Sequence, residues 1–159
     1  MIIRRSLVLL ILIFTLSFSR GADISAGGTP ESLIQSLYSQ HRPGQKKTID
    51  WCNRQTVSKY CDSRLTNLFI KECDCQKKNH EVCNLDWDPF YDSQDFDEVA
   101  PDPRIKNVGQ NSFEVTFNNF GEKKLIYEVV KTEVGWRISN IESPSMNWSL
   151  VDVLSGKSK

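Results

Sequence analysis

The amino-acid sequence predicts an α+β fold in which N-terminal helices pack on a curved antiparallel sheet. Apolar residues recur at helical spacing up to about residue 74, and from residue 104 onward they alternate with polar residues. Between these regions, residues 83–98 are rich in acidic and aromatic side chains and follow neither pattern. We call residues 83–98 the connector. The two periodicities predict a helical half and a sheet half within one domain, joined by the connector.

The first 21 residues have the features of a secretory signal peptide. Arg4 and Arg5 precede an uncharged apolar run of about 14 residues, and small residues follow it. A helix that spans a bilayer needs roughly 20 apolar residues, so this run is short for a permanent anchor. No cysteine follows that would carry a lipoprotein anchor. We expect a cleaved signal peptide over 1–21, a flexible lead-in over 22–29, one α+β domain over 30–155 and a tail over 156–159.

The charge of the chain argues against nucleic acid and anionic membranes as partners. The full sequence has 20 basic and 20 acidic residues. Removal of the leader takes away three arginines and no acid, which leaves a net charge of about −3. About 137 residues remain, enough to bury a core. We expect no cofactor, no stable membrane anchor after processing, and a protein partner with a basic surface.

Two helices are predicted before the connector. Thr29-Pro30-Glu31 is typical of a helix start, with a hydroxyl cap, a proline at the first helical position and an acid in the first turn. This helix is expected to end at His41. A second helix is predicted from about Gln55 to Asp74, and Cys61 lies on its apolar face. Trp51 and Cys52 are expected to fold back over the same face.

The two histidines each have a structural and a functional interpretation. A histidine can act as a base or a metal ligand. His41, however, ends the first predicted helix, where a partly cationic ring interacts favourably with the helix dipole. We favour this structural interpretation. His80 lies in the polar run from Gln76 to Glu81, which is expected to be a solvated loop.

The cysteines are expected to form disulfides in an oxidising compartment. They are Cys52, Cys61, Cys73, Cys75 and Cys83. A zinc site with His80 is the alternative, but one residue between Cys73 and Cys75 is fewer than structural zinc sites normally have. We expect Cys83 to pair with Cys73 or Cys75, and Cys52 to pair with Cys61, which leaves a thiol beside Cys73. A catalytic role for the unpaired thiol is disfavoured because only His80 is near it in the sequence.

The connector contains several aspartates and no lysine or arginine. Asp86, Asp88 and Asp92 are candidate oxygen ligands for calcium, but the run lacks the turn glycine and the closing glutamate of a twelve-residue calcium loop. We favour a folded loop in which the aspartates accept backbone N–H groups and cap turns. Its rings are expected to enter the core. These rings belong to Trp87, Phe90, Tyr91 and Phe96.

An antiparallel meander is predicted after the connector. A short edge strand over 104–108 precedes a strand in which Phe113, Val115 and Phe117 alternate with polar residues. Further strands are expected over 124–131 and 134–141, with turns at 118–121 and near 132–133. A short closing helix or irregular tail follows around residues 148–154. Asn147-Trp148-Ser149 is a glycosylation sequon, which matters only in a host that modifies secreted proteins.

Short motifs with a family resemblance span nearly the whole domain. They are Ser63-Arg64-Leu65 with Leu68, Asp88-Pro89-Phe90 with Gln94-Asp95, Tyr127 to Lys131, Gly135-Trp136-Arg137-Ile138, and Ser149 to Leu154. Together they resemble the YbjP/YqhG-type bacterial envelope domain of unknown function, within the nuclear transport factor two-like (cystatin-like) superfamily. The resemblance implies a cone-shaped fold with a pocket under the helices, lined or filled by Trp87, Phe90, Tyr91, Tyr127 and Trp136. It implies no reaction, and the cysteine cluster departs from the family pattern.

Three functional hypotheses follow. The leading one is a non-enzymatic periplasmic or secreted binding module, one form of which blocks a secreted toxin by placing the acidic connector against a basic cleft. The alternative is a small hydrolase or isomerase that uses an aspartate in the cone as general base. An aspartate beside Tyr91 or Tyr127 in a cavity would favour it. The third is a calcium-binding envelope protein.

Overall fold

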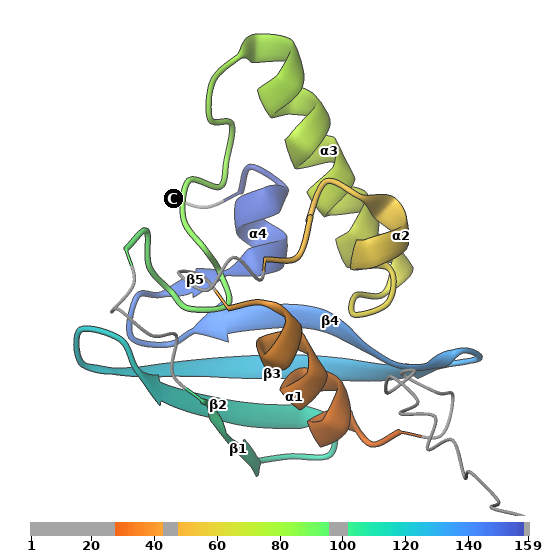
Figure 1. Ribbon diagram of the computed structural model, residues 1–159, viewed down its shortest axis with the longest axis vertical. Coiled ribbons are helices and arrows are strands. Elements are labelled where there is room, and N and C mark those ends of the chain that lie inside the picture. The colour runs from red at the N-terminus through yellow and green to blue at the C-terminus, as the bar shows by residue number, and fades with distance from the viewer. Residues whose placement is uncertain (1–27, 43–47, 96–101, 158–159) are drawn as a thin grey trace, which may run out of the picture.

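The computed structural model describes residues 28–42, 48–95 and 102–157, so the predicted signal peptide lies outside the described residues. Helices precede a five-stranded antiparallel sheet of order β1-β2-β3-β4-β5, and the α+β class is confirmed (Figure 1). The helices are α1 (Pro30–Gln40), α2 (Arg54–Val57), α3 (Ser63–Asn79) and α4 (Leu150–Leu154). The strands are β1 (Arg104–Asn107), β2 (Ser112–Asn118), β3 (Glu122–Thr132), β4 (Gly135–Ser143) and β5 (Trp148–Ser149).

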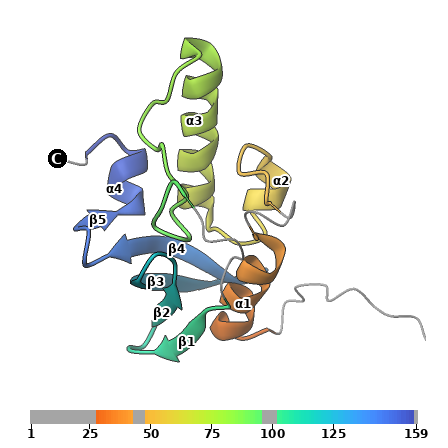
Figure 2. The ribbon, with the colours of Figure 1, turned by 60° about the vertical axis from the view of Figure 1, so that its left-hand side comes forward.

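Helix α1 lies across one face of the sheet, as both ribbon views show (Figures 1 and 2). Its start is as predicted, because the Thr29 side chain accepts a hydrogen bond from the Ser32 N–H and proline occupies the first helical position. Its buried residues face the sheet; they are Leu33, Ile34, Leu37 and Tyr38. The ring of Tyr38 contacts Phe117 of β2 and Tyr127 of β3.

The predicted single helix over Gln55–Asp74 is wrong in its bounds. The structure has a short α2 and a longer α3, separated by a segment that pairs with β4. The Ile138 N–H donates to the Tyr60 carbonyl at 2.7 Å, and the Asp62 N–H donates to the Ile138 carbonyl at 2.9 Å. Asp62 then caps α3 by accepting from the Leu65 N–H. A tertiary contact thus interrupts a pattern that is helical in the local sequence.

Helix α3 also extends further than predicted, through most of the run that was expected to be a solvated loop. It ends at Asn79, and His80 follows in the left-handed conformation with φ of 57°. In both ribbon views its C-terminal end projects away from the sheet (Figures 1 and 2). This end therefore has few neighbours in the sheet. Contacts within the helical half have to hold the start of the connector against it.

The sheet confirms the predicted meander and its buried face. Phe113 lies opposite Tyr127, and Val115 opposite Leu125, with all four side chains buried. A register shift between Glu128 and Val129 was not predicted. Because an extra residue changes which face the following side chains occupy, the buried apolar side chains of β4, Ile138 and Ile141, are three positions apart and do not alternate strictly. The predicted closing segment forms β5 and α4.

The structure contains two disulfides, and one of the predicted pairings is wrong. Cys75 pairs with Cys83, and Cys75 was one of the two partners expected for Cys83. Cys52 pairs with Cys73 and not with Cys61. The unpaired cysteine is therefore Cys61, whereas the predicted pairings left Cys73 or Cys75 unpaired. Cys61 is buried on the core side, as its position on the apolar face predicted. Two disulfides are typical of proteins from oxidising, extracytoplasmic environments. None of the described helices is long and apolar enough to span a bilayer.

Candidate functional site

The connector turns back into the core between α1 and the sheet. The Asp88 N–H donates to the Ser93 carbonyl at 3.0 Å, and this closes a tight loop over residues 88–93. Phe90 and Tyr91 lie within that loop and are fully buried. Trp51 stacks on Phe90 with ring centroids 4.2 Å apart. Two of the four predicted connector rings, Phe90 and Tyr91, thus fill the core as predicted. Trp87 is only half-buried, and Phe96 lies outside the described residues.

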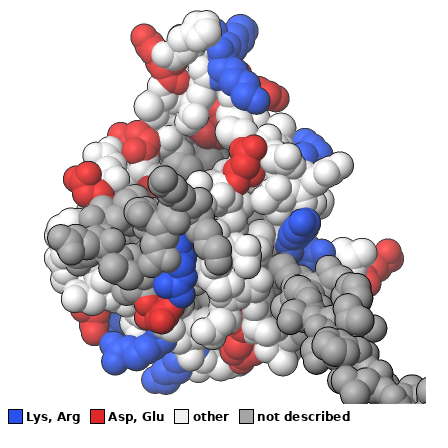
Figure 3. Space-filling view, viewed as in Figure 1, with Lys and Arg blue, Asp and Glu red and all other residues white. Residues whose placement is uncertain are grey.

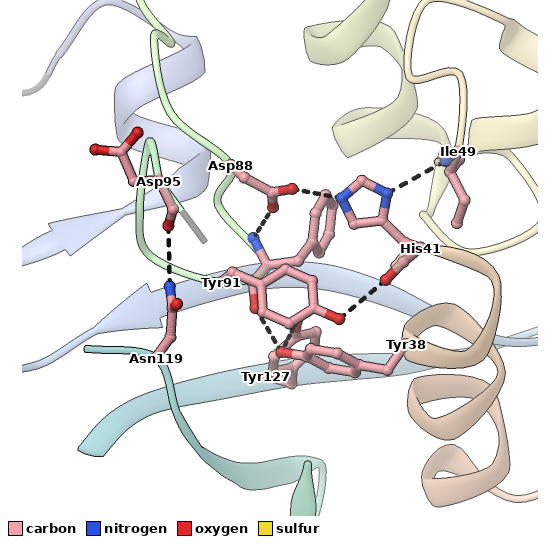
Figure 4. A network of polar contacts seen from close by, with 9 residues as sticks. Tyr38, His41, Ile49, Asp88, Tyr91, Asp95, Asn119 and Tyr127 are labelled. Atoms are coloured by element: carbon pink, nitrogen blue, oxygen red, sulfur yellow. Dashed lines mark hydrogen bonds and ion pairs between the residues drawn. The ribbon is translucent and has the colours of Figure 1, made fainter. Parts of the chain in front are cut away.

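His41 joins three segments of the chain through both of its ring nitrogens (Figure 4). Its Nε2 lies 2.5 Å from Oδ2 of Asp88, and its Nδ1 accepts the Ile49 N–H at 3.2 Å. Since Nδ1 accepts from a backbone amide, the proton of the neutral ring is on Nε2, which donates to Asp88. His41 therefore fixes the end of α1, residue 49 and the connector together. This network was not predicted, because His41 was interpreted only as the end of a helix.

The carboxylate of Asp88 performs a second local role. Its Oδ1 accepts the Phe90 N–H at 2.9 Å, and its side chain is 14% exposed. Asp88 is thus a turn cap as well as the acceptor for His41. Asp88 also lines a pocket of about 290 Å³, together with His41, Trp51 and Trp87.

The hydroxyls of Tyr38, Tyr91 and Tyr127 lie between α1 and the sheet (Figure 4). Tyr38 Oη donates to the Phe90 carbonyl at 2.7 Å, so the Tyr127 hydroxyl, 2.9 Å away, donates to Tyr38. Tyr91 Oη donates to the His41 carbonyl at 3.0 Å. Burial raises the pKa of Tyr38, Tyr91 and Tyr127, so the phenols stay neutral. The pocket expected under the helices is filled at this place by satisfied aromatic side chains.

Asp92 anchors the far side of the connector loop to the end of the sheet. Its Oδ2 accepts from Ser143 Oγ at 2.9 Å and its Oδ1 from Trp148 Nε1 at 2.8 Å. Asp88 and Asp92 therefore bind different partners, whereas calcium requires six to eight oxygens around one point. Within residues 28–42, 48–95 and 102–157, no three His, Cys, Asp or Glu side chains are grouped closely enough to hold a metal ion. The geometry gives the calcium hypothesis no support.

Glu72 holds the start of the connector on α3, and sequence reasoning missed it. The buried carboxylate accepts four hydrogen bonds, from the Asn84 N–H and side-chain amide, the Leu85 N–H and the Gln76 amide. Burial opposes its ionisation, but these donors outweigh it and lower the pKa of Glu72. Its spacing from Leu65 and Phe69 places an acid on the apolar face of the helix. That spacing was the signal in the sequence.

Of the remaining connector residues with the family resemblance, Gln94 and Asp95 lie at the surface. Gln94 donates to the carbonyl and the carboxylate of Asp86, and the Asp95 carbonyl accepts from Asn119. The side chains of Asp86, Gln94 and Asp95 are exposed. Pro89, by contrast, is buried with Phe90. The motif thus combines an inward anchor with an outward acidic edge.

Two other candidates have separate environments. Trp136 is half-buried away from the connector, and Lys131 Nζ lies 5.2 Å from its ring centroid. Cys61 lines a larger open pocket of about 700 Å³, together with Asp62, Val134 and Arg137. Burial raises the pKa of the Cys61 thiol, which keeps it protonated and a poor nucleophile. Neither residue supports a catalytic site.

Comparison with known proteins does not assign a family. Searches against protein-family models, curated proteins and solved structures found no match to this chain.

Proposed function

We propose that the chain is an exported, non-enzymatic binding module that presents the acidic connector to a basic partner protein in the periplasm or outside the cell. The observation that carries the proposal is the division of the connector aspartates. Asp88 and Asp92 are anchored inward, while Asp86 and Asp95 remain exposed on the same short loop. A fixed loop that displays charge loses little conformational freedom when it binds.

The charge distribution supports a protein partner. No lysine or arginine occurs from residue 79 to residue 103. On the face seen in Figure 3, acidic and basic side chains are interspersed and no broad basic area is visible. This face suits neither the phosphate backbone of nucleic acid nor an anionic membrane. Inhibition of a secreted toxin with a basic cleft remains one form of this proposal.

The export part of the proposal rests on the leader and the disulfides. The disulfides Cys52–Cys73 and Cys75–Cys83 require an oxidising compartment to persist. The arginine-flanked apolar segment at the N-terminus supplies the route to such a compartment. Membership of the YbjP/YqhG-type envelope family is part of the same proposal, and it is supported by the anchored Asp88-Pro89-Phe90 motif.

The test is capture of partners from extracytoplasmic extract at increasing salt. We expect a captured protein with a basic surface, whose association slows several-fold in an Asp86→Asn, Asp95→Asn double variant. The matched control is Glu133→Gln with Asp152→Asn, which removes two exposed acids elsewhere. Capture of no salt-sensitive partner, or equal slowing by both double variants, would contradict the proposal.

A hydrolase or isomerase is the second candidate, because Asp88 does lie close to Tyr91 and lines a pocket with His41. In such an enzyme the imidazole would need a free lone pair, whereas Nδ1 of His41 already accepts the Ile49 N–H. Nitrogen-15 spectra of the histidine rings distinguish the candidates. The binding-module proposal expects the proton of His41 on Nε2; a proton on Nδ1, with Nε2 free to accept, would favour the enzyme.

A further inference from the structure

Two of the four tryptophans meet at the molecular surface in a pocket of about 290 Å³ between the connector and the turn that joins β4 to β5. The lining residues are Trp87, Asp92, Ser93, Gln94, Met146 and Trp148. We call this pocket the tryptophan slot. The rings of Trp87 and Trp148 are 5.9 Å apart between centroids and tilted by 60°. They form two walls of the slot and do not close over it as a sandwich.

The other two tryptophans already have partners for their ring faces. Trp51 stacks on Phe69 and Phe90, and Trp136 carries the ammonium group of Lys131. Among the described residues that line the tryptophan slot there is one carboxylate and no basic side chain. The slot therefore contains two indole rings that can attract a cation, and no basic side chain lines it.

The carboxylate of Asp92 gives the slot its charge preference. Asp92 is 8% exposed, and its two hydrogen bonds leave further lone pairs on the carboxylate. Because its Oδ1 accepts the Trp148 Nε1–H, it also polarises that indole and makes the ring face more negative. An apolar ring beside a shielded carboxylate is a site for a cation that has a flat, weakly hydrated surface.

Hydrogen bonds from Ser143 and Trp148 to Asp92 hold together the two loops that form the slot. Asp92 and Asn147, one in each loop, have left-handed backbone conformations with φ of 50° and 54°. Met146, next to Asn147, is 62% exposed and forms the adaptable rim of the slot. The indole N–H of Trp87 has no acceptor among the described residues, so packing alone positions that ring. A prepared aspartate and indole thus lie beside a rim that can adjust to a ligand.

We propose that the tryptophan slot binds an arginine side chain of the partner protein, with the guanidinium group against the indole of Trp148 and its charge balanced by Asp92. This proposal deepens and rests on the proposed function, since it names the side chain by which a basic partner is recognised. Arginine fits better than lysine because its planar group stacks on aromatic rings and is less strongly hydrated. The carboxylate supplies the complementary charge that selects a cation over a neutral side chain.

The direct test uses a small probe and does not require the partner. Protein labelled with nitrogen-15 at its tryptophans is titrated with N-acetylarginine methylamide and, separately, with the neutral isostere N-acetylcitrulline methylamide. We expect saturable shifts of the Trp87 and Trp148 indole signals with the arginine compound in the millimolar range. The citrulline compound should bind at least about tenfold more weakly. Equal shifts with both compounds, or shifts only of Trp51 and Trp136, would overturn the proposal.

A matched pair of surface variants gives a second test. Met146→Lys places a cation at the rim of the slot, while Val134→Lys makes the same charge change at an equally exposed position, 63% exposed, in the turn between β3 and β4. Met146→Lys should abolish binding of the arginine probe, and Val134→Lys should leave it unchanged. If both variants bind the probe like the wild type, the assignment of the slot is wrong.

The same variants separate the two proposals when a partner is captured. Loss of capture by Met146→Lys but not by Val134→Lys supports the slot. Capture that both variants retain, together with failure of the arginine probe, overturns the slot but leaves the acidic binding module standing. If the wild type captures no salt-sensitive partner, the proposed function fails and the probe titration still decides the slot.

Discussion

The helical half of the molecule and its sheet are stabilised by different interactions. The sheet consists of neighbouring strands whose alternating apolar side chains face the core, and it contains no cysteine. The helical half has a projecting α3 and an irregular connector, held by two disulfides, by Glu72 and by the pair His41–Asp88. An irregular segment lacks a backbone ladder, so specific polar and covalent contacts have to position it. The comparison suggests that substitutions of such contacts will be most damaging in the helical half.

The largest effect is expected at His41. His41→Ala removes the donor to Asp88 and the acceptor for the Ile49 N–H, both of which are largely buried. The expected loss is about 4 kcal/mol in the free energy of unfolding, measured by denaturant titration. His41→Gln and His41→Asn each retain the reach of one ring nitrogen, so each should recover part of the loss. A loss below about 1 kcal/mol for His41→Ala would show that the network contributes little.

Removal of a disulfide should give the next largest loss of stability, and the loss should be larger for the disulfide that closes the longer loop. Cys52→Ala with Cys73→Ala opens a separation of 21 residues, and Cys75→Ala with Cys83→Ala opens one of 8. Chain-entropy reasoning gives losses of about 3 and about 2.5 kcal/mol. Thermal melts under non-reducing conditions measure both. Cys61→Ala is the control, because it removes a cysteine without removing a bridge; destabilisation of all three variants to the same extent would mean that the bridges are not the cause.

Glu72 gives a smaller effect with a distinctive pH dependence. Glu72→Gln should cost about 2 kcal/mol at neutral pH, because it replaces an acceptor oxygen that faces the Asn84 amide with a donor. The pKa of Glu72 is lowered in the folded protein. Its contribution is therefore complete above the ordinary carboxyl pKa of about 4.3 and is lost as the pH falls through the folded value. The difference between wild type and variant should shrink on acidification; a constant difference would contradict this account.

The sheet could be predicted from sequence because its signals are local. Alternation in Phe113, Val115 and Phe117, together with short turns, determines both the buried face and the pairing of consecutive strands. The register shift at Glu128 and Val129 has no comparable signal, and it was missed. Tertiary contacts decide such irregularities.

The helical half could be predicted only in outline because its decisive contacts join distant residues. Pairing of Tyr60 and Asp62 with Ile138 separates α2 from α3, although the local pattern favours one continuous helix. The correct partner of Cys52 depends on how α3 packs, which spacing does not reveal. His41 and Glu72 did carry a signal, since each continues an apolar stripe by one helical turn from Leu37 and Phe69 respectively. A polar residue on an apolar stripe predicts a buried hydrogen-bond network, although it does not name the partners.

The tryptophan slot forms where the connector meets the end of the sheet. Trp87 belongs to the connector and Trp148 to the segment after the sheet, so no sequence motif contains both. Asp92 brings them together by accepting from Trp148 while it closes the connector loop. The anchoring aspartates thus position the surface that we propose for binding.

Non-reducing peptide mapping of the exported protein tests the central claim most directly, because that claim is covalent bracing of the helical half. Cleavage before Asp74 separates Cys73 from Cys75 and makes the two bridges distinguishable. We expect one linked pair from Cys52 and Cys73, one link between Cys75 and Cys83, and a Cys61 thiol that reacts only after unfolding. Five freely alkylated cysteines in the native protein, or Cys61 within a bridge, would contradict the account.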